Sequence, residues 1–469
     1  MTRGLHWFRN DLRLRDNTAL TEAARRCDAL AAVYVFDDRI LKSPRTGAPR
    51  VRFLLACLER LAQDLEARGV PLLVRRGDPA AELSLLLEQQ RFDLLSFNRD
   101  TTPTAVRRDA GVREAAAKHG VTVVESADRV VFEAREIRTK TGGPYSVFTP
   151  YARRWRERFE QDPRPPKRAP RLPRGPDRLA SDPLLDAAAL GFGGDETKLP
   201  AAGEEAARRR LRAFLDERVA RYDEDRDVPA IDGTSRLSPQ LRFGTISVRD
   251  CIAAAREVAA SDPRRAKGAE KWETELIWRE FYAALLEENP RVLREEWKPE
   301  FAGVAWEEAP EHFEAWCQGR TGFPFVDAGM RQLLETGWMH NRVRMVVASF
   351  LTKDLLIDWR RGEEWFLQRL LDGDPASNNG GWQWAASTGA DAAPYFRIFN
   401  PVSQGERFDP EGEYVRRFLP ELAALPGKSV HRPWESPMLA GDYPAPIVDH
   451  GERREEALAR YQRAKESNT

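Results

Sequence analysis

The first third of the chain alternates short apolar runs with amphipathic segments. The apolar runs predict five buried strands, which cover residues 4–8, 29–36, 71–75, 94–98 and 121–124. The amphipathic segments between them, such as 50–67 and 79–90, predict helices. Strands that alternate with helices indicate a parallel sheet with both faces covered, so an α/β domain is expected over residues 1–130. Such sheets bind ligands at the carboxyl ends of their strands, although neither a G-x-G-x-x-G motif nor a P-loop is present.

The pattern changes twice after this domain. Between residues 131 and 200 the periodicity is lost, and a group of prolines predicts a long interdomain linker: Pro163, Pro165, Pro166, Pro170, Pro173 and Pro176. From residue 201 to residue 469 the pattern is helical, which predicts an all-α domain. Eleven of the thirteen tryptophans follow residue 270, an unusual concentration.

A helix predicted over residues 270–287 has two different faces. One face is an ordinary apolar stripe at helical spacing, formed by Ile277, Phe281, Ala284 and Leu285. The other face mixes charge with aromatic rings at i, i+3, i+4 and i+7: Glu275, Trp278, Arg279 and Tyr282. This mixture is unusual for a core face and for a solvated face, so it favours the wall of a wet pocket. A surface ion pair beside a half-buried tryptophan is the alternative.

The segment 337–358 predicts a second wall of this kind. Asn341, Arg344 and Met345 fall together on the helix, whereas Arg342 points elsewhere and could reach a phosphate. The core side is supplied by Val343, Val346, Val347, Phe350 and Leu351. Each residue has a structural explanation by itself, and the combination of two such walls is what points to a site.

Residues 232–244 predict a turn that leads into a helix. Ser238 and Pro239 are expected at the N-cap and N1 positions. Thr234, Ser235 and Arg236 add hydroxyls and a cation that capping does not explain. Helix N-termini and hydroxyl donors bind phosphate well, so this turn is a candidate pyrophosphate site.

The third candidate segment is 372–384. It contains Asp372, Gly373 and Asp374, followed by the run Asn-Asn-Gly-Gly-Trp-Gln-Trp over 378–384. Asp372 is expected to pair with a cation such as Arg344, and the two glycines allow the backbone to approach a flat ligand closely.

Composition limits the classes of function. Hydrophobic residues make up 42% of the chain and charged residues 32%, with 74 basic and 74 acidic side chains, so nucleic-acid binding would need a local basic patch. We expect neither a membrane span nor a secretion signal, and cytoplasmic location is the default. Neither cysteine nor histidine spacing indicates a metal site or a disulfide framework, and buried thiols are expected at Cys27, Cys57, Cys251 and Cys317.

With these motifs in view, the chain resembles the photolyase and cryptochrome family along nearly its whole length, and within it the class I photolyases that repair cyclobutane pyrimidine dimers. The marks are the segments 7–13 (Trp-Phe-Arg-Asn-Asp-Leu-Arg), 234–238, 278–282 (Trp-Arg-Glu-Phe-Tyr), 337–342 and 372–384. The resemblance implies a Rossmann-like α/β antenna domain followed by an all-α domain that binds FAD and DNA.

The resemblance also implies a reaction. In the family, excited and fully reduced FAD passes an electron to the dimer, the cyclobutane ring splits, and the electron returns, so the protein mainly positions the reactants. The implied cofactor-binding residues are Tyr222, Thr234, Ser235, Arg236, Leu237, Ser238, Glu275, Trp278, Arg279, Tyr282, Arg344, Asp372, Gly373, Asp374 and Asn378, the last facing the flavin N5.

The dimer must leave the duplex to reach a buried flavin. Trp278 and Trp384 are the expected stacking faces for the flipped bases, while Glu275 and Asn341 are expected to hydrogen-bond them, with Met345 beside Asn341. Three tryptophans match the family's electron relay to an oxidised flavin: Trp382, Trp359 and Trp306. The alternative for each is core packing. Further DNA contacts are expected from Arg226, Arg342, Arg397 and Gln404.

Two questions stay open at this level. Folate-binding members carry an Asn-Glu pair where this chain has Thr104 and Ala105, so the antenna chromophore is a folate, a deazaflavin, another flavin or none. The rival functions are a (6-4) photolyase, which is expected to be His-rich where this chain reads Trp-Met-His-Asn-Arg, and a signalling cryptochrome. The expected lesion-binding residues Glu275, Trp278, Asn341 and Trp384, and an end at Thr469 that leaves no long tail, favour repair. A monomer without an obligate protein partner is a separate expectation.

Overall fold

The computed structural model describes residues 1–176, 179 and 181–467, which form two compact units. The first unit comprises residues 1–195, 200–220 and 235–290, and the second comprises 196–199, 221–234 and the chain from 291 onward. Asp177, Arg178 and Ala180 of the expected linker lie outside the described residues. The domain ranges given by the sequence pattern, 1–130, 131–200 and 201–469, stay a prediction.

The first unit contains a five-stranded parallel sheet in the order β3-β2-β1-β4-β5. Its strands are β1 (Arg3–Phe8), β2 (Ala29–Phe36), β3 (Leu72–Arg76), β4 (Leu94–Asn98) and β5 (Thr122–Ser126). The connecting helices are α1 (Thr18–Arg26), α2 (Asp38–Leu41), α3 (Ala48–Glu66), α4 (Pro79–Gln90) and α5 (Pro103–Lys118). Every apolar run that predicted a strand forms one, with ends shifted by at most two residues.

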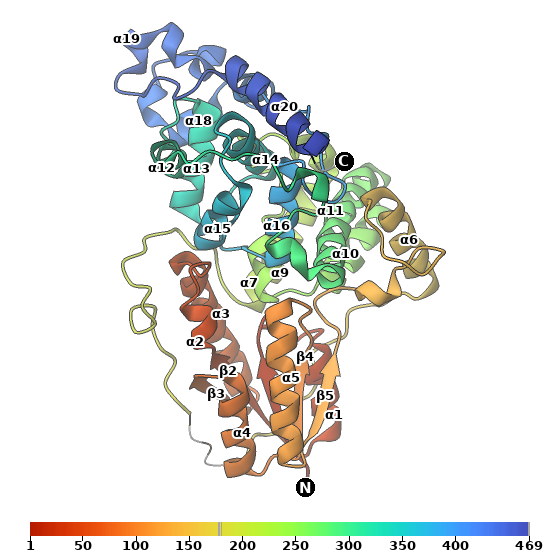
Figure 1. Ribbon diagram of the computed structural model, residues 1–469. Coiled ribbons are helices and arrows are strands. Elements are labelled where there is room, and N and C mark those ends of the chain that lie inside the picture. Colours follow the sequence, from red (N-terminus) through yellow and green to blue (C-terminus); the bar gives the residue numbers. More distant parts are fainter. Residues whose placement is uncertain (177–178, 180, 468–469) are drawn as a thin grey trace. The chain divides into compact units, whose positions relative to one another are not determined.

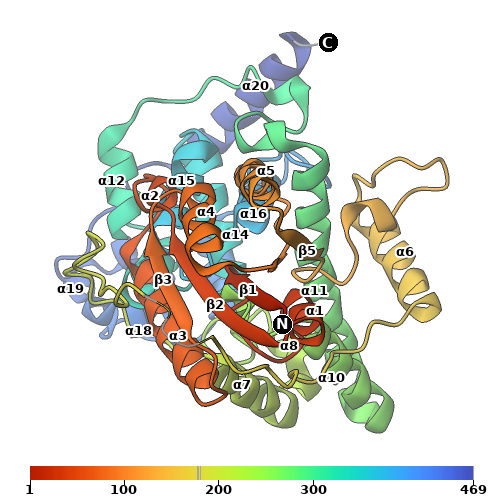
Figure 2. The ribbon, with the colours of Figure 1, turned by 90° about the horizontal axis from the view of Figure 1, so that it is seen from below.

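Helices cover both faces of this sheet, as the sequence pattern predicts for buried parallel strands. Helices α4 and α5 pack against each other, while α1 packs on β1, β4 and β5. Figure 2 shows α4 and α5 on one side of the strands and α1 and α3 on the other. The core beneath α4 and α5 consists of apolar side chains, among them Leu5, Val33, Leu95, Phe97, Leu86 and Val112.

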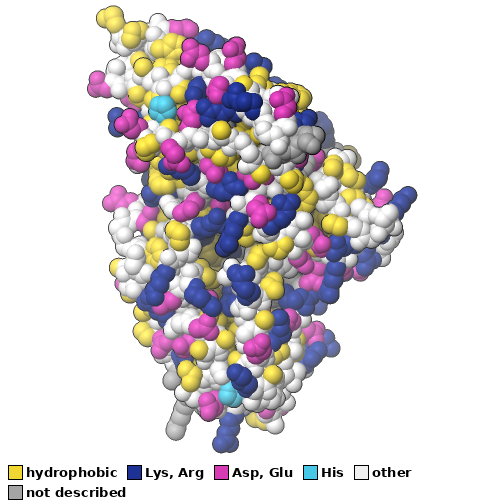
Figure 3. Space-filling view, in the orientation of Figure 1, with side chains coloured by type: hydrophobic (Ala, Val, Ile, Leu, Met, Phe, Trp, Pro, Cys, Tyr) yellow, Lys and Arg dark blue, Asp and Glu magenta, His cyan; other side chains and the backbone are white. Residues whose placement is uncertain are grey.

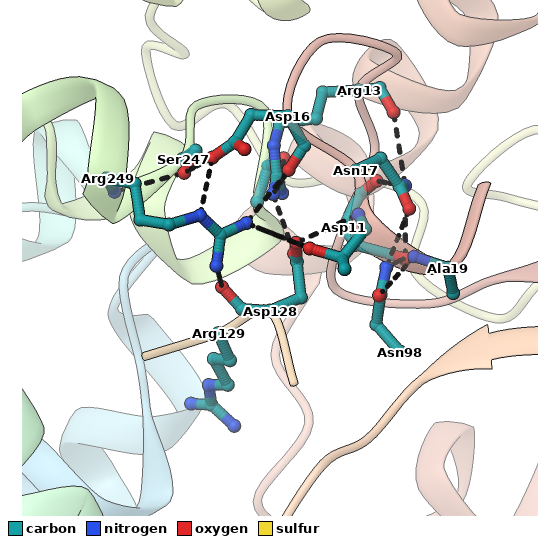
Figure 4. A network of polar contacts seen from close by, with 12 residues as sticks. Asp11, Arg13, Asp16, Asn17, Ala19, Asn98, Asp128, Arg129, Ser247 and Arg249 are labelled. Carbon is teal, nitrogen blue, oxygen red and sulfur yellow. Dashed lines mark hydrogen bonds and ion pairs between the residues drawn. The ribbon is translucent and has the colours of Figure 1, made fainter. Parts of the chain in front are cut away.

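A buried polar network joins the ends of the strands to the helices of the same unit (Figure 4). The Asp128 carboxylate accepts from Arg13 at 2.6 Å and from Arg249 at 2.8 Å. Arg249 also pairs with Asp16 at 2.8 Å. Burial raises the pKa of Asp128, but Arg13 and Arg249 outweigh it and hold that pKa below its ordinary value. Part of the 7–13 motif therefore acts as a structural anchor between the loop after β1 and α10 (Val248–Ser261).

The stretch expected as a linker contains a helix, α6 (Phe148–Gln161), and a short 3-10 turn, η1 (Ala134–Glu136). Helix α6 packs on α11 (Pro263–Glu288), which lies in the same unit. Its buried residues Phe148, Tyr151, Ala152 and Trp155 recur at helical spacing. The group of prolines that predicted a linker begins only at residue 163, after the helix ends, so it gives no information about residues 148–161.

The other helices divide between the units (Figure 1). The first unit adds α7 (Glu204–Glu217) and α9 (Ser238–Phe243). The second holds α8 (Tyr222–Asp225), α12 (Pro310–Gln318), α13 (Pro324–Thr336), α14 (Asn341–Ser349), the π-helical turn η5 (Phe350–Asp354), α15 (Trp359–Arg369), α16 (Pro375–Ala385), α17 (Pro401–Phe408), α18 (Glu413–Phe418), α19 (Pro437–Ala440) and α20 (His450–Ser467). Short 3-10 turns complete the chain: η2 (Val219–Arg221), η3 (Pro290–Leu293), η4 (Pro299–Phe301), η6 (Pro420–Leu422), η7 (Gly427–His431) and η8 (Pro433–Glu435).

The core of the second unit includes side chains of α12, α13, α14, α15, α16 and α18. It includes Trp316, Val343, Val347, Trp359 and Trp382, so several of the clustered tryptophans are core residues. All four cysteines are buried free thiols, as the sequence predicts. No helix among the described residues is long and apolar enough to cross a membrane.

Candidate functional site

Helix α11 carries the first predicted wall, within the first unit. The helix starts at Pro263, where the Asp262 side chain caps it by accepting from the Arg264 backbone N–H. Its apolar stripe is buried at Ile277, Phe281 and Leu285, while Ala284 is only half-buried. The mixed face is half-buried at all four of its positions: Glu275, Trp278, Arg279 and Tyr282. The helix therefore has a buried face and a half-buried face, as predicted. Glu275 also pairs with Lys271 at 3.7 Å, so the pocket wall stays a prediction.

The Trp278 indole is held by other aromatic rings. Phe148 of α6 stacks on it with ring centroids 3.7 Å apart and ring planes 8° apart. Tyr282, one turn further along α11, lies 5.5 Å away in a tilted arrangement. Trp278 thus has one face covered by Phe148, a contact that the sequence did not suggest.

Arg279 and Glu280 connect α11 to the loop that follows β5. Arg279 donates to the Arg129 carbonyl oxygen at 2.7 Å, and burial together with the Arg129 charge lowers the pKa of Arg279 to about 10. Glu280 accepts from the Trp155 indole N–H at 2.7 Å and from backbone N–H groups of the loop. Burial raises the pKa of Glu280. The contacts of these two residues serve the packing of the first unit, and the cofactor contact expected of Arg279 stays a prediction.

The turn before α9 differs in one respect from its prediction. The helix begins at Ser238, Leu237 occupies the N-cap position, and no side chain caps the helix. The assignment of Ser238 and Pro239 to N-cap and N1 is therefore wrong by one position, because Arg236 takes a left-handed conformation (φ 47°) that sets the start of the helix. Ser235 is tied to α7, since its carbonyl oxygen accepts from Arg210 at 2.6 Å.

Tyr222 and Arg226 lie in the second unit, at α8. Tyr222 is buried, and the Arg226 guanidinium lies 5.7 Å from the centroid of its ring. Thr234, at the end of this segment, is half-buried.

Helix α14 carries the second predicted wall. It is capped by His340, whose side chain accepts from the Arg342 backbone N–H. The Asn341 amide nitrogen lies 3.9 Å from the Met345 sulfur, so these two predicted partners do come together. Arg342 points to a different neighbour, as expected, and pairs with Asp227 at 2.9 Å while lying over the Phe408 ring.

The predicted pair of Arg344 with Asp372 is confirmed, with an N–O distance of 2.8 Å. Arg344 also donates to the Met339 carbonyl oxygen, which fixes its direction along α14. Asp372 is 8% exposed, and its second oxygen, Oδ1, is buried with no hydrogen-bond partner among the described residues. A buried acceptor of this kind fits a polar ligand that supplies an N–H or O–H donor, as the isoalloxazine and ribose of FAD do.

The start of α16 arranges the next predicted residues. Asp374 caps the helix by accepting from the Ala376 and Ser377 backbone N–H groups. The Asn378 side-chain amide donates to the Glu363 carbonyl oxygen at 3.0 Å, which fixes the plane of that amide. Gly381 is exposed and a Cβ atom there would meet nothing within 4 Å, so the expected approach of a flat ligand stays a prediction. Gly373 is buried between the two aspartates.

Trp382 and Trp384 follow on α16 and have different surroundings. Trp382 is 2% exposed and packs edge-on against Phe366 and Trp316. Gly362 of α15 makes room for it, because a Cβ atom there would lie 2.1 Å from the indole ring. Trp384 is only half-buried, with Phe399 stacked at 6.5 Å.

The other two tryptophans of the expected relay differ in burial. Trp359 is fully buried and donates to Glu296 at 3.3 Å. Trp306 is half-buried and meets Tyr461 edge-on at 6.2 Å. Of the three, only Trp306 is partly exposed, and the relay itself stays a prediction.

The remaining expected DNA contacts are on the second unit. Arg397 is exposed, and Gln404 is half-buried on α17. The chain has 74 basic and 74 acidic side chains, and on the face drawn in Figure 3 the two kinds are interspersed. DNA binding would therefore depend on a few local cations rather than on the charge of the whole protein.

Three residues with notable contacts were not predicted from the sequence. Phe148 lay in the expected linker, and Gly362 is recognisable only once Trp382 lies against it. Lys353 is fully buried, donates to the Ser387 hydroxyl at 2.9 Å and lies 3.8 Å from the centroid of the Tyr461 ring. Nothing in the sequence around Lys353 predicts that its ammonium group is buried, because a lysine side chain normally reaches solvent.

Comparison with known proteins agrees with this geometry. The family model described as DNA photolyase matches residues 4–171, and the model described as FAD binding domain of DNA photolyase matches residues 272–463. A deoxyribodipyrimidine photo-lyase of Halobacterium salinarum is 44% identical over 480 residues, which cover 98% of this chain and 99% of that protein.

Solved structures agree as well. A class III photolyase of Agrobacterium tumefaciens has a TM-score of 0.92 and 39% identity, and the match covers 99% of this chain and 98% of that one. An archaeal photolyase of Sulfolobus tokodaii, solved with two FAD molecules, has a TM-score of 0.84 and 34% identity, and the match covers 98% of this chain and all of that one. The predicted α/β sheet followed by helices is confirmed, and this chain belongs to the photolyase and cryptochrome family.

Proposed function

We propose that this chain is a light-dependent lyase that uses FAD to split cyclobutane pyrimidine dimers in UV-damaged DNA. The name of the full-length relative and the match to an FAD-binding domain support this function. The single observation that carries it is the pair of Arg344 with the buried Asp372, in which Oδ1 of Asp372 remains available to a ligand donor.

Bound FAD would supply a light-driven electron to the dimer and take it back once the ring has opened. In this proposal Asp372 and Asp374 hold the polar groups of the cofactor, and Arg344 holds the Asp372 carboxylate in place through their 2.8 Å contact. The amide of Asn378, fixed by Glu363, presents its oxygen at a constant angle. The turn at Thr234, Ser235, Arg236, Leu237 and Ser238, with Tyr222, is assigned to the phosphates.

The lesion is assigned to side chains that are half-buried, with the exception of Asn341, which is exposed. Trp278 and Trp384 are half-buried indoles, and each base stacked on such a ring gains roughly 1–3 kcal/mol. Glu275 and Asn341 would hydrogen-bond the pyrimidine edges, and Met345 would support Asn341 from 3.9 Å. Hydrogen-bond donors at the pyrimidine carbonyls would stabilise the negative charge that arrives during ring opening.

The tryptophans Trp382, Trp359 and Trp306 are assigned to electron supply for an oxidised cofactor. Indole is readily oxidised; Trp382 and Trp359 are both buried, and Trp306 is half-buried. For grip on the DNA backbone we assign Arg226, Arg342, Arg397 and Gln404. We also propose membership of class I, a cytoplasmic location and a monomer without an obligate partner. The antenna chromophore stays open between a folate, a deazaflavin, another flavin and none.

The test is repair itself. The purified protein, with its flavin reduced, is mixed with an oligonucleotide that contains one thymine dimer, and blue light is applied while intact thymines are counted by chromatography. We expect repair in light and none in darkness. A protein that binds FAD but restores no thymine would refute the lyase and support the photoreceptor alternative; repair of a (6-4) product alone would instead support the other photolyase.

A further inference from the structure

Phe148 stacks closely on Trp278. The ring centroids are 3.7 Å apart and the planes differ by only 8°, so the two rings lie face to face. Aromatic rings in a protein core more often meet edge-on or in an offset stack, because their quadrupoles repel when one ring lies directly over another. A face-to-face contact at this distance requires that both rings be held from outside.

Helix α6 supplies that restraint by three separate contacts with α11. Phe148 also meets Phe281 edge-on at 5.8 Å, and Tyr151, one turn along α6, lies 5.2 Å from the same ring. Two turns from Phe148, the Trp155 indole N–H donates to the buried Glu280 at 2.7 Å. Phe148 is 7% exposed, so its ring has little freedom to leave this position.

The consequence for Trp278 is that its two faces are unequal. One face is covered by Phe148, while the residue as a whole remains half-buried. An indole whose ring plane is already fixed loses less conformational entropy when a base stacks on it. It can also accept a base on one face only, which fixes the orientation of that base.

We propose that Phe148 is a positioning residue for the lesion: it backs Trp278, holds the indole plane, and leaves a single face on which a flipped pyrimidine stacks. This inference rests on the proposed function, because it needs Trp278 to bind the dimer. It assigns to α6, in the stretch between sheet and helices, a role in damage recognition in addition to its role in packing.

The test is a set of ring-specific variants. Phe148→Leu keeps an apolar side chain but removes the flat ring, whereas Phe148→Tyr keeps the ring. The matched control is Phe159→Leu, which removes a ring on the same helix that stacks on Trp155 at 5.3 Å and does not contact Trp278. The FAD-loaded proteins are titrated in darkness with a dimer-containing oligonucleotide and with the same sequence undamaged, and repair of the bound complex is measured after a single flash.

We expect Phe148→Leu to weaken binding of the dimer oligonucleotide roughly three- to tenfold, the value of an aromatic pair beyond its buried area. Binding of undamaged DNA and repair per bound complex should stay unchanged. Phe148→Tyr should bind the dimer oligonucleotide with the affinity of the parent protein. The inference is refuted if Phe148→Leu binds the dimer like the parent, if both oligonucleotides lose affinity equally, or if Phe159→Leu has the same effect. A parent protein that does not prefer dimer DNA would refute the proposed function, and the inference with it.

Discussion

Two buried aspartates, each paired with arginine, show how the two units use charge differently. In the first unit, both oxygens of Asp128 are engaged, one by Arg13 and the other by Arg249. In the second unit, Arg344 engages one oxygen of Asp372, and Oδ1 has no partner among the described residues. The indoles follow the same division: the Trp155 N–H donates to Glu280, whereas the buried Trp382 N–H has no partner in the described chain. Satisfied groups indicate structure, and unsatisfied buried groups indicate a ligand or a redox role.

The largest expected effect is that of Trp382→Phe on photoreduction. Replacing the indole with a ring that is much harder to oxidise should abolish light-driven reduction of oxidised FAD, while repair by chemically reduced protein continues. The measurement is the loss of flavin absorbance under illumination with an external electron donor. Trp155→Phe is the control in the other unit: it should photoreduce normally and lose stability, since Glu280 loses a donor. Normal photoreduction by Trp382→Phe would remove this residue from the relay.

The next effect concerns stability. Asp128→Ala would leave Arg13 and Arg249 buried without their shared partner, so the free energy of unfolding should fall by about 3–5 kcal/mol. Urea denaturation followed by circular dichroism measures this change. If Asp128→Ala instead lost FAD at unchanged stability, the network would have a ligand role and the comparison would fail.

Asp372→Ala should act mainly on the cofactor. Loss of a buried charged acceptor should weaken FAD binding by about 1.5–3 kcal/mol, or roughly ten- to a hundredfold. Equilibrium dialysis with the apoprotein gives the dissociation constant. The apoprotein itself should be destabilised less than by Asp128→Ala, since Arg344 is partly exposed and can be solvated. Equal losses of apoprotein stability in the two variants would contradict the assignment.

The smallest expected effect comes from Lys353, a buried cation of the second unit. Burial lowers the pKa of Lys353 to about 7, with a smaller contribution from Lys298, whereas the unfolded chain has an ordinary lysine pKa near 10.4. Between these two values the unfolded state binds more protons, so stability should rise with pH there and be independent of this group below pH 7 and above about 10.4.

From pH 7 to pH 8 the gain should be about 1 kcal/mol, as long as Lys353 titrates alone. Urea midpoints of the parent and of Lys353→Met, measured across this range, give the difference. A parent whose stability shows the same pH slope as the variant would mean that Lys353 stays charged in the folded state.

The sequence by itself determined the local elements and much of the local chemistry. Strand runs such as 29–36 appear where the apolar pattern predicts them, because a parallel strand buried on both faces must be apolar throughout. The two faces of α11 were also predictable, because residues at helical spacing share a face. The pairing of Arg344 with Asp372 was predictable as a pair of opposite charges within two candidate segments. The family motifs supplied the roles that spacing alone left open.

Tertiary structure decided which buried polar groups have all their hydrogen-bond partners within the protein. The sequence around Asp128 and Asp372 does not show how many arginines each will contact. The fold brings Arg13 and Arg249 to Asp128, and it brings Arg344 to Asp372. Only the fold places Phe148, from a proline-flanked stretch, against Trp278, and puts Gly362 against Trp382. These contacts join residues far apart in the chain, and the free energy of each depends on burial and on every other neighbour, which no local pattern records.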